Sequence, residues 1–217
     1  MKYFILIFIG LITLVIFASC GLIYTTEGAP TKEQKELMEK YGGIYVFDKK
    51  IRDEIIQREK EKKEYRGKYL GEYIQVGNET HFVDFTYLNN KFPQILSNGC
   101  KYYLRGLSKQ EYERTDLSPY KEKIKEYMGE EAFNKLQPNI LLISFYTINE
   151  NGVEKDIPIE ISVSISWYKT TYGLYGDEGA GFRLTNSYSV DIAGDNIFYL
   201  ENGKFIKSDE KDKEGTH

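Results

Sequence analysis

The sequence predicts an α+β fold, with an antiparallel sheet and helices packed on one face, behind an apolar N-terminal segment. Two observations predict it. In the C-terminal third, apolar and polar residues alternate with a period of two over 159–168 and 182–192, which is typical of half-buried strands. Earlier segments instead combine helical spacing with helix-capping residues. The 217 residues are enough for one such domain behind the apolar segment.

Three helices are predicted in the first two thirds of the chain. Thr31 and Gln34 match a capping box that opens a helix over Lys32–Tyr41. A second helix extends from near Asp48 to Arg66, with an apolar stripe in its first turns only. Ser118 and Pro119 open the third helix, and Gly129 interrupts it. The expected buried side of this third helix comprises Tyr120, Ile124, Tyr127 and Met128.

Strands are predicted where the spacing of apolar residues changes from a helical period to a period of two. Tyr69–Val76 and His81–Leu88 are expected to form a hairpin, and Cys100–Leu104 and Ile140–Ile148 are expected to be further strands. Asn202-Gly203 predicts a tight hairpin near the C-terminus, because both residues of a type I′ turn must accept a positive φ.

The first twenty residues indicate a membrane-targeting segment. Lys2 precedes an uncharged apolar run from Tyr3 to Phe17, and small residues then stand directly before Cys20. The positive charge at Lys2 and the terminal amine favour a cytoplasmic amino end. The remainder is therefore expected to face the periplasm or the cell exterior.

The residues Phe17-Ala18-Ser19-Cys20 resemble the lipobox of bacterial lipoproteins. The resemblance implies cleavage before Cys20, acylation of its sulfur and attachment of the protein to a membrane. It covers this segment only. Leu is usual where Phe17 stands, and the apolar residues Leu22–Tyr24 replace a polar tether, so an uncleaved membrane helix and ordinary signal-peptide cleavage remain alternatives.

These features predict four regions. Residues 1–20 are a signal peptide or anchor, 21–31 a tether, 32–207 a single α+β domain and 208–217 a charged disordered tail.

Charge and cysteine content narrow the classes of function. The chain has 29 basic and 33 acidic residues and a net charge of −4, which argues against a nucleic-acid-binding surface. With Cys20 lipidated or within the bilayer, Cys100 has no partner, so no disulfide framework is expected.

No catalytic, metal or cofactor site is predicted. A nucleophilic arrangement of Cys100, His81 and Asp84 can be drawn, but His81 and Asp84 are three apart in a predicted strand and would face opposite sides. The sequence contains no Cys/His cluster for zinc, and 191–195 offers too few oxygen ligands for calcium.

The Gly-rich stretch Tyr172–Gly181 is the candidate binding segment. It lacks the Lys-Ser/Thr of a phosphate-binding loop and is predicted to be a long hairpin loop. Long loops often carry function. The expected contact residues are Tyr172, Tyr175, Asp177 and Glu178.

Two classes of function follow. The favoured one is a non-catalytic, membrane-tethered lipoprotein of the cell envelope that binds a protein partner, as an assembly accessory, a surface lipoprotein or an immunity protein. The alternative is an envelope hydrolase, because carboxylate pairs leave little trace in a sequence. Its candidate carboxylates are Asp84, Glu160, Asp177 and Asp191.

Overall fold

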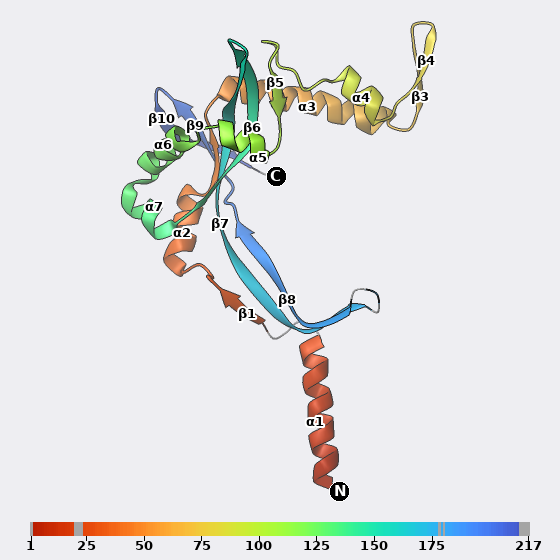
Figure 1. Cartoon of the computed structure of the whole chain (residues 1–217), viewed down its shortest axis with the longest axis vertical. Coiled ribbons are helices and arrows are strands. Elements are labelled where there is room, and N and C mark those ends of the chain that lie inside the picture. Colours follow the sequence, from red (N-terminus) through yellow and green to blue (C-terminus); the bar gives the residue numbers. More distant parts are fainter. Residues whose placement is uncertain (1, 20–23, 178, 180, 213–217) are drawn as a thin grey trace.

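One long strand organises the sheet of the computed structural model, which describes residues 2–19, 24–177, 179 and 181–212 (Figure 1). This strand is β7 (Val153–Asp177). Its first half pairs with β6 (Asn139–Glu150) and β2 (Gly43–Val46), and its second half pairs with β8 (Gly181–Ile192) and β1 (Tyr24–Glu27). At roughly 3.3 Å per residue, such a strand has a contour length of about 80 Å.

The first half of β7 lies in a head and its second half in an arm. The head contains β2 and β6, with β5 (Lys101–Tyr103) beside β6, and β9 (Asn196–Glu201) and β10 (Lys204–Lys211) beyond β2. The arm is residues 165–177 of β7 with β8 and β1. In Figure 1 the arm extends from the head toward helix α1 (Lys2–Ser19).

The sheet is mixed, whereas the sequence predicted an antiparallel one. β2 pairs with β9 in parallel, with Tyr45 opposite Phe198, and the other pairings named here are antiparallel. The two strands are far apart in the sequence, so a local hydrophobic pattern carries no information on their relative direction.

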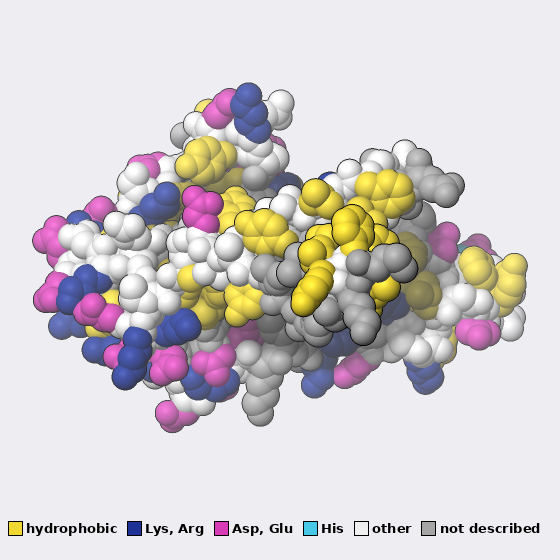
Figure 2. All heavy atoms as spheres, turned by 90° about the horizontal axis from the view of Figure 1, so that it is seen from below, with side chains coloured by type: hydrophobic (Ala, Val, Ile, Leu, Met, Phe, Trp, Pro, Cys, Tyr) yellow, Lys and Arg dark blue, Asp and Glu magenta, His cyan; other side chains and the backbone are white. Residues whose placement is uncertain are grey.

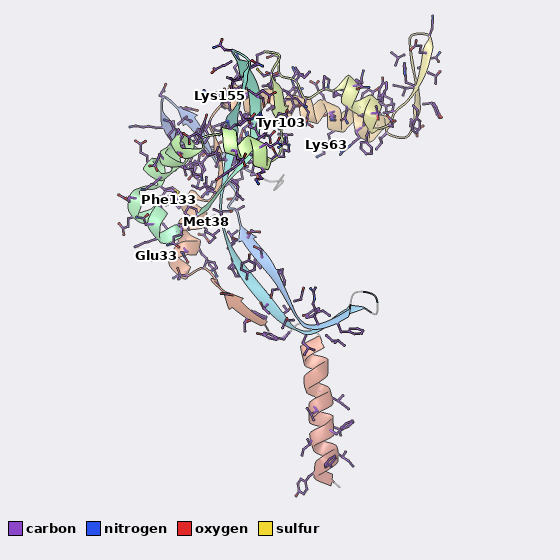
Figure 3. The ribbon with its side chains drawn as sticks, in the orientation of Figure 1. Glu33, Met38, Lys63, Tyr103, Phe133 and Lys155 are labelled. Atoms are coloured by element: carbon purple, nitrogen blue, oxygen red, sulfur yellow. The ribbon has the colours of Figure 1, made fainter. Side chains whose placement is uncertain are left out.

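The main core lies under three helices, α2 (Lys32–Tyr41), α6 (Ser118–Met128) and α7 (Glu130–Leu136). Met38 and Phe133 come from α2 and α7, and both pack in this cluster (Figure 3). The predicted capping box of α2 is confirmed. The core also contains the following sheet residues: Tyr45, Leu142, Phe145, Ile161, Val163, Ile165, Phe198 and Phe205.

Helices cover both faces of the sheet, not one face as predicted. Ile44 and Val46 flank Tyr45 in β2 but belong to a different cluster, because successive strand residues point to opposite faces. Helix α3 (Lys49–Tyr69) covers this second face and packs Ile55 against Tyr102. Both faces of the sheet are therefore apolar in the head.

Irregular pairing changes the alternation predicted for residues 159–167. The register of β6 and β7 shifts on either side of Ser144. Ile159 consequently packs with Ile55 and Tyr102, while Ile161 belongs to the main core.

The predicted strand His81–Leu88 is wrong in its second half. β3 (Tyr73–Val76) and β4 (Glu79–Phe82) form the hairpin, but α4 (Phe85–Lys91) then begins. The cause is Asp84, whose carboxylate accepts a hydrogen bond of 2.7 Å from the Tyr87 backbone N–H and caps the helix. In Figure 1 the hairpin lies beyond the end of α3, away from α1.

Two predicted boundaries also differ. Part of the expected tether is β1, which is paired to β7, and β10 continues to Lys211 into the expected tail, of which 213–217 lie outside the described residues. The Asn202-Gly203 turn is confirmed, with φ values of 50° and 80°. No helix in the described part of the chain is both long and apolar enough to cross a membrane.

Candidate functional site

The candidate binding segment is mostly strand, not the predicted loop. β7 continues to Asp177 and β8 begins at Gly181, so the connection is short. Gly176 permits this close pairing: its φ is +108°, and a Cβ there would lie 1.9 Å from the Gly181 carbonyl oxygen.

The two predicted contact tyrosines help to hold the arm together. The Tyr175 hydroxyl donates to Thr171 Oγ1 at 2.7 Å, and the Tyr172 hydroxyl lies 3.4 Å from Thr25 Oγ1 on β1. Tyr172 remains partly exposed. The Asp177 side chain and Glu178 lie outside the described residues.

The arm instead exposes a different set of apolar side chains. Phe182 and Leu184 share one face of β8, since they are two residues apart in a strand. Phe182 pairs with Gly176, and Leu184 lies opposite the irregularity between Tyr172 and Tyr175. The arm's exposed large apolar residues include Tyr24, Tyr168, Leu174, Phe182, Leu184 and Tyr188.

A concave site lies in the head. It is an open cleft of about 1010 Å³ between the β6–β7 hairpin, the start of α6 and the segment after β2. Apolar side chains of Phe47, Tyr120, Ile157 and Leu200 line it. The Phe47 and Tyr120 rings meet edge to face, with centroids 4.8 Å apart, and burial raises the pKa of Tyr120.

Charged groups of both signs surround this apolar lining. Lys123 and Lys155 are exposed basic residues in the cleft, and Asp116 and Glu154 are exposed acidic ones. The Ser118 backbone N–H bonds to Asp116 at 2.9 Å and lowers the pKa of that carboxyl group.

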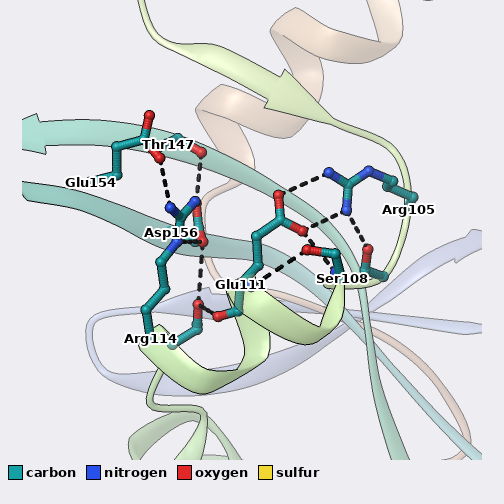
Figure 4. A network of polar contacts seen from close by, with 9 residues as sticks. Arg105, Ser108, Glu111, Arg114, Thr147, Glu154 and Asp156 are labelled. Carbon is teal, nitrogen blue, oxygen red and sulfur yellow. Dashed lines mark hydrogen bonds and ion pairs between the residues drawn. The ribbon is translucent and has the colours of Figure 1, made fainter.

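A buried carboxylate fixes one wall of the cleft (Figure 4). The side chain of Asp156 is 0% exposed and accepts two hydrogen bonds from Arg114, at 2.8 and 3.0 Å. Thr147 donates to the same carboxylate at 2.6 Å. Arg114 also pairs with Glu154 at 2.6 Å, so one guanidinium joins helix α5 (Lys109–Arg114) to β7.

The start of α5 is fixed by a second ion pair. The Arg105 guanidinium donates to both carboxylate oxygens of Glu111, at 2.7 and 2.8 Å, and lowers the pKa of Glu111 to about 2. Ser108 and Glu111 form the capping box of the helix. Lowered pKa values keep Glu111 and Asp116 ionised, which does not suit a general acid.

Of the four carboxylates proposed for a hydrolase, the three with described side chains lie away from this cleft. Glu160 lies on the second face of the sheet, where it binds Arg52 at 2.5 Å and accepts from Ser144 at 2.6 Å. Asp84 caps α4, and Asp191 pairs with Ser166 in the arm.

The drawn Cys–His arrangement has no support in the contacts either. Cys100 packs against the cluster that contains Ile55 and Tyr102, whereas His81 is on the outer hairpin, with its ring centroid 5.6 Å from that of Tyr87. Among the residues that the structure describes, no group of three or more His, Cys, Asp or Glu is placed to hold a metal ion.

Comparisons with protein-family models, with curated proteins and with solved structures gave no match. The arm and the cleft are therefore the features of the molecule from which function can be inferred. The sequence pattern marked Asp48, Pro119 and Tyr120 only as helix residues, and it singled out none of the polar residues of the wall, which are Arg114, Thr147, Glu154 and Asp156. The capping box of Ser108 and Glu111 and the turn residues Asn151-Gly152 were the local signals that marked its elements.

Proposed function

We propose that this chain is a membrane-tethered, non-catalytic lipoprotein of the cell envelope that binds a protein partner in the cleft of its head. The tether is a lipid on Cys20, as the lipobox-like residues imply. An assembly accessory or an immunity-type role fits this arrangement, because in both the head occupies a surface of another envelope protein.

The observation that carries the proposal is the separation of the cleft from the tether along one strand. β1, which follows Cys20, pairs with β7 near Thr171, whereas Pro158 of the same strand lines the cleft. The two positions are 13 residues apart in the sequence, a separation of about 40 Å along a strand. In Figure 3, Lys155 lies at the opposite end of the molecule from α1.

The cleft itself favours a protein segment over a small polar ligand. Its apolar lining can accept an aromatic or aliphatic side chain, and its charges of both signs can pair with flanking residues of a partner. Asp156 is already satisfied by Arg114 and Thr147, so this wall is rigid before a partner arrives.

A site-specific photo-crosslinker tests the cleft in the full chain, expressed in a bacterium. It is placed at Val153, which is 67% exposed on the cleft, and in a control at Tyr73, which is 75% exposed on the outer hairpin. We expect one discrete adduct with an envelope protein from position 153 and none from position 73.

A charge-reversal variant provides a second test of binding in the cleft. Lys123→Glu with Lys155→Glu alters two exposed side chains of the cleft, so the fold is retained while the adduct falls by about tenfold or more. Equal adducts from both crosslinker positions, or an adduct that the charge reversal leaves unchanged, would contradict binding in the cleft.

A further inference from the structure

We propose that the arm rests on the lipid surface of the membrane and inserts Leu174, Phe182 and Leu184 into the interface between headgroups and acyl chains. This inference rests on the tether half of the proposed function. It assigns the arm to the bilayer and leaves the head cleft for the protein partner.

Chain connectivity places the tether beside the arm. Tyr24 pairs with Thr171 in the antiparallel contact of β1 and β7. Cys20 precedes Tyr24 by four residues, and four residues span at most about 14 Å when fully extended. A lipid on Cys20 therefore enters the bilayer close to the arm, whatever conformation residues 21–23 adopt.

The alternative anchor leads to the same place. α1 ends at Ser19, five residues before Tyr24, and it contacts β7. In Figure 1 the end of α1 lies just below the bend of β7 and β8. A lipid on Cys20 and an uncleaved N-terminal segment would thus both attach the chain beside the arm.

The arm exposes the side chains that such a position requires. Leu174, Phe182 and Leu184 are 60%, 63% and 73% exposed, although they are among the most apolar residues of the arm. Figure 2 views the molecule from the α1 end, so the hydrophobic side chains of α1 lie in front of the arm. Exposed apolar side chains that share one face of a strand, as Phe182 and Leu184 do, are typical of contact surfaces.

Tyrosines and a basic residue accompany these apolar groups. Tyr24 and Tyr188 are exposed on the arm, and tyrosine is enriched at membrane interfaces because its ring is apolar and its hydroxyl is polar. Lys169 pairs with Tyr188 across the strands, and its Nζ lies 4.2 Å from the centre of the Tyr24 ring. This cation can pair with anionic phospholipid headgroups.

The lipid surface is favoured over a second copy of the chain because the tether already fixes the arm at the membrane. A partner molecule would have to compete with a bilayer that is always within reach. β8 pairs only with β7 among the described strands, so pairing of two arms remains an outcome that the experiment must separate.

Tryptophan fluorescence tests the inference in the full chain, purified in detergent and reconstituted into vesicles of phosphatidylethanolamine and phosphatidylglycerol. The sequence has one tryptophan, Trp167, so Trp167→Phe provides a silent background. Phe182→Trp and Leu184→Trp are the probes, and Tyr73→Trp on the outer hairpin is the control. The side chains of Tyr73, Phe182 and Leu184 are exposed, so the fold should tolerate tryptophan at each of these positions.

The position of each tryptophan is measured with two quenchers of its fluorescence, one in the lipid acyl chains and one in the water. We expect lipids brominated on their acyl chains to remove most of the emission of the Phe182→Trp and Leu184→Trp proteins and iodide in the water to have little effect. The interfacial depth of such groups is roughly 5–10 Å, which the bromine atoms reach. The Tyr73→Trp control should show the reverse pattern.

The contrary outcomes are distinguishable. If the protein floats with the vesicles but iodide quenches both probes, the tether stands and the arm inference is overturned. If the probes are protected from iodide but not quenched by bromine, and the protection disappears as the protein is diluted in lipid, the arm binds a second copy of the chain. That result would also overturn the inference. Failure to float with the vesicles overturns the tether and this inference together.

Discussion

Arg114 holds Asp156 through two hydrogen bonds, from Nε at 2.8 Å and from Nη2 at 3.0 Å. The Asp156 side chain is fully buried, while the Arg114 side chain is about one third exposed and also reaches Glu154. The pair therefore joins a short surface helix to the central strand of the sheet and fixes one wall of the cleft.

Removal of one partner of this pair should destabilise the head. Arg114→Met leaves the Asp156 carboxylate buried with only its threonine donors, which costs about 3 kcal/mol of unfolding free energy. Arg114→Met with Asp156→Leu should recover part of this loss, because the uncompensated charge is gone. Urea denaturation of the full chain measures both values; a single variant as stable as the wild type would contradict the assigned role.

Glu111 predicts a specific loss of stability in acid. Its pKa falls to about 2 in the fold, through the bonds from Arg105, from a usual value of 4.5. A lowered folded-state pKa contributes stability that is complete above pH 4.5 and is lost as the pH falls toward 2. In Glu111→Gln the slope of unfolding free energy against pH in this window should fall by up to about one proton. An unchanged slope would show that the ion pair does not act on folding.

Gly43 should tolerate no side chain. Its φ is +134°, and a Cβ would lie 2.0 Å from the Asn196 carbonyl oxygen, at the parallel contact of β2 and β9. Gly43→Ala should cost more than about 2 kcal/mol, because backbone must move at the centre of the sheet. Gly67→Ala is the matched control: nothing lies within 4 Å in helix α3, so it should stabilise by about 0.5–1 kcal/mol. Thermal unfolding compares the two.

Cys20 should carry the lipid. Palmitate labelling of the chain expressed in a bacterium should be lost in Cys20→Ser, and the apparent mass should rise because the leader is no longer removed. Cys100→Ser, at the other cysteine of the chain, should keep the label. A wild type that is neither labelled nor cleaved would establish the uncleaved helix instead.

Local signals in the sequence were sufficient for several elements. The capping box of Thr31 and Gln34, the helix that Gly129 ends and the Asn202-Gly203 turn depend on residues within one turn of chain, and each is found in the structure. The mixed helix and strand composition follows from the same kind of information, because the side-chain period of each segment reports its own backbone conformation.

The candidate contact residues of the arm show what local signals could not predict. A Gly-rich run predicts a loop, yet Tyr172 and Tyr175 are in a strand because β8 offers a partner that Gly176 allows to approach closely. The same pairing turns Leu174, Phe182 and Leu184 outward, and the alternating pattern by itself had suggested buried positions for Phe182 and Leu184.

The sequence by itself determined the local structure of this protein and the position of its lipobox-like cysteine, since both depend on neighbours along the chain. Only the tertiary structure decided the parallel contact of β2 with β9, the second apolar face under α3, the wall made by Arg114 and Asp156, and the position of β1 beside the arm. Those features join residues tens of positions apart. Their energies come from desolvation and pairing across the fold, which no local pattern of residues encodes.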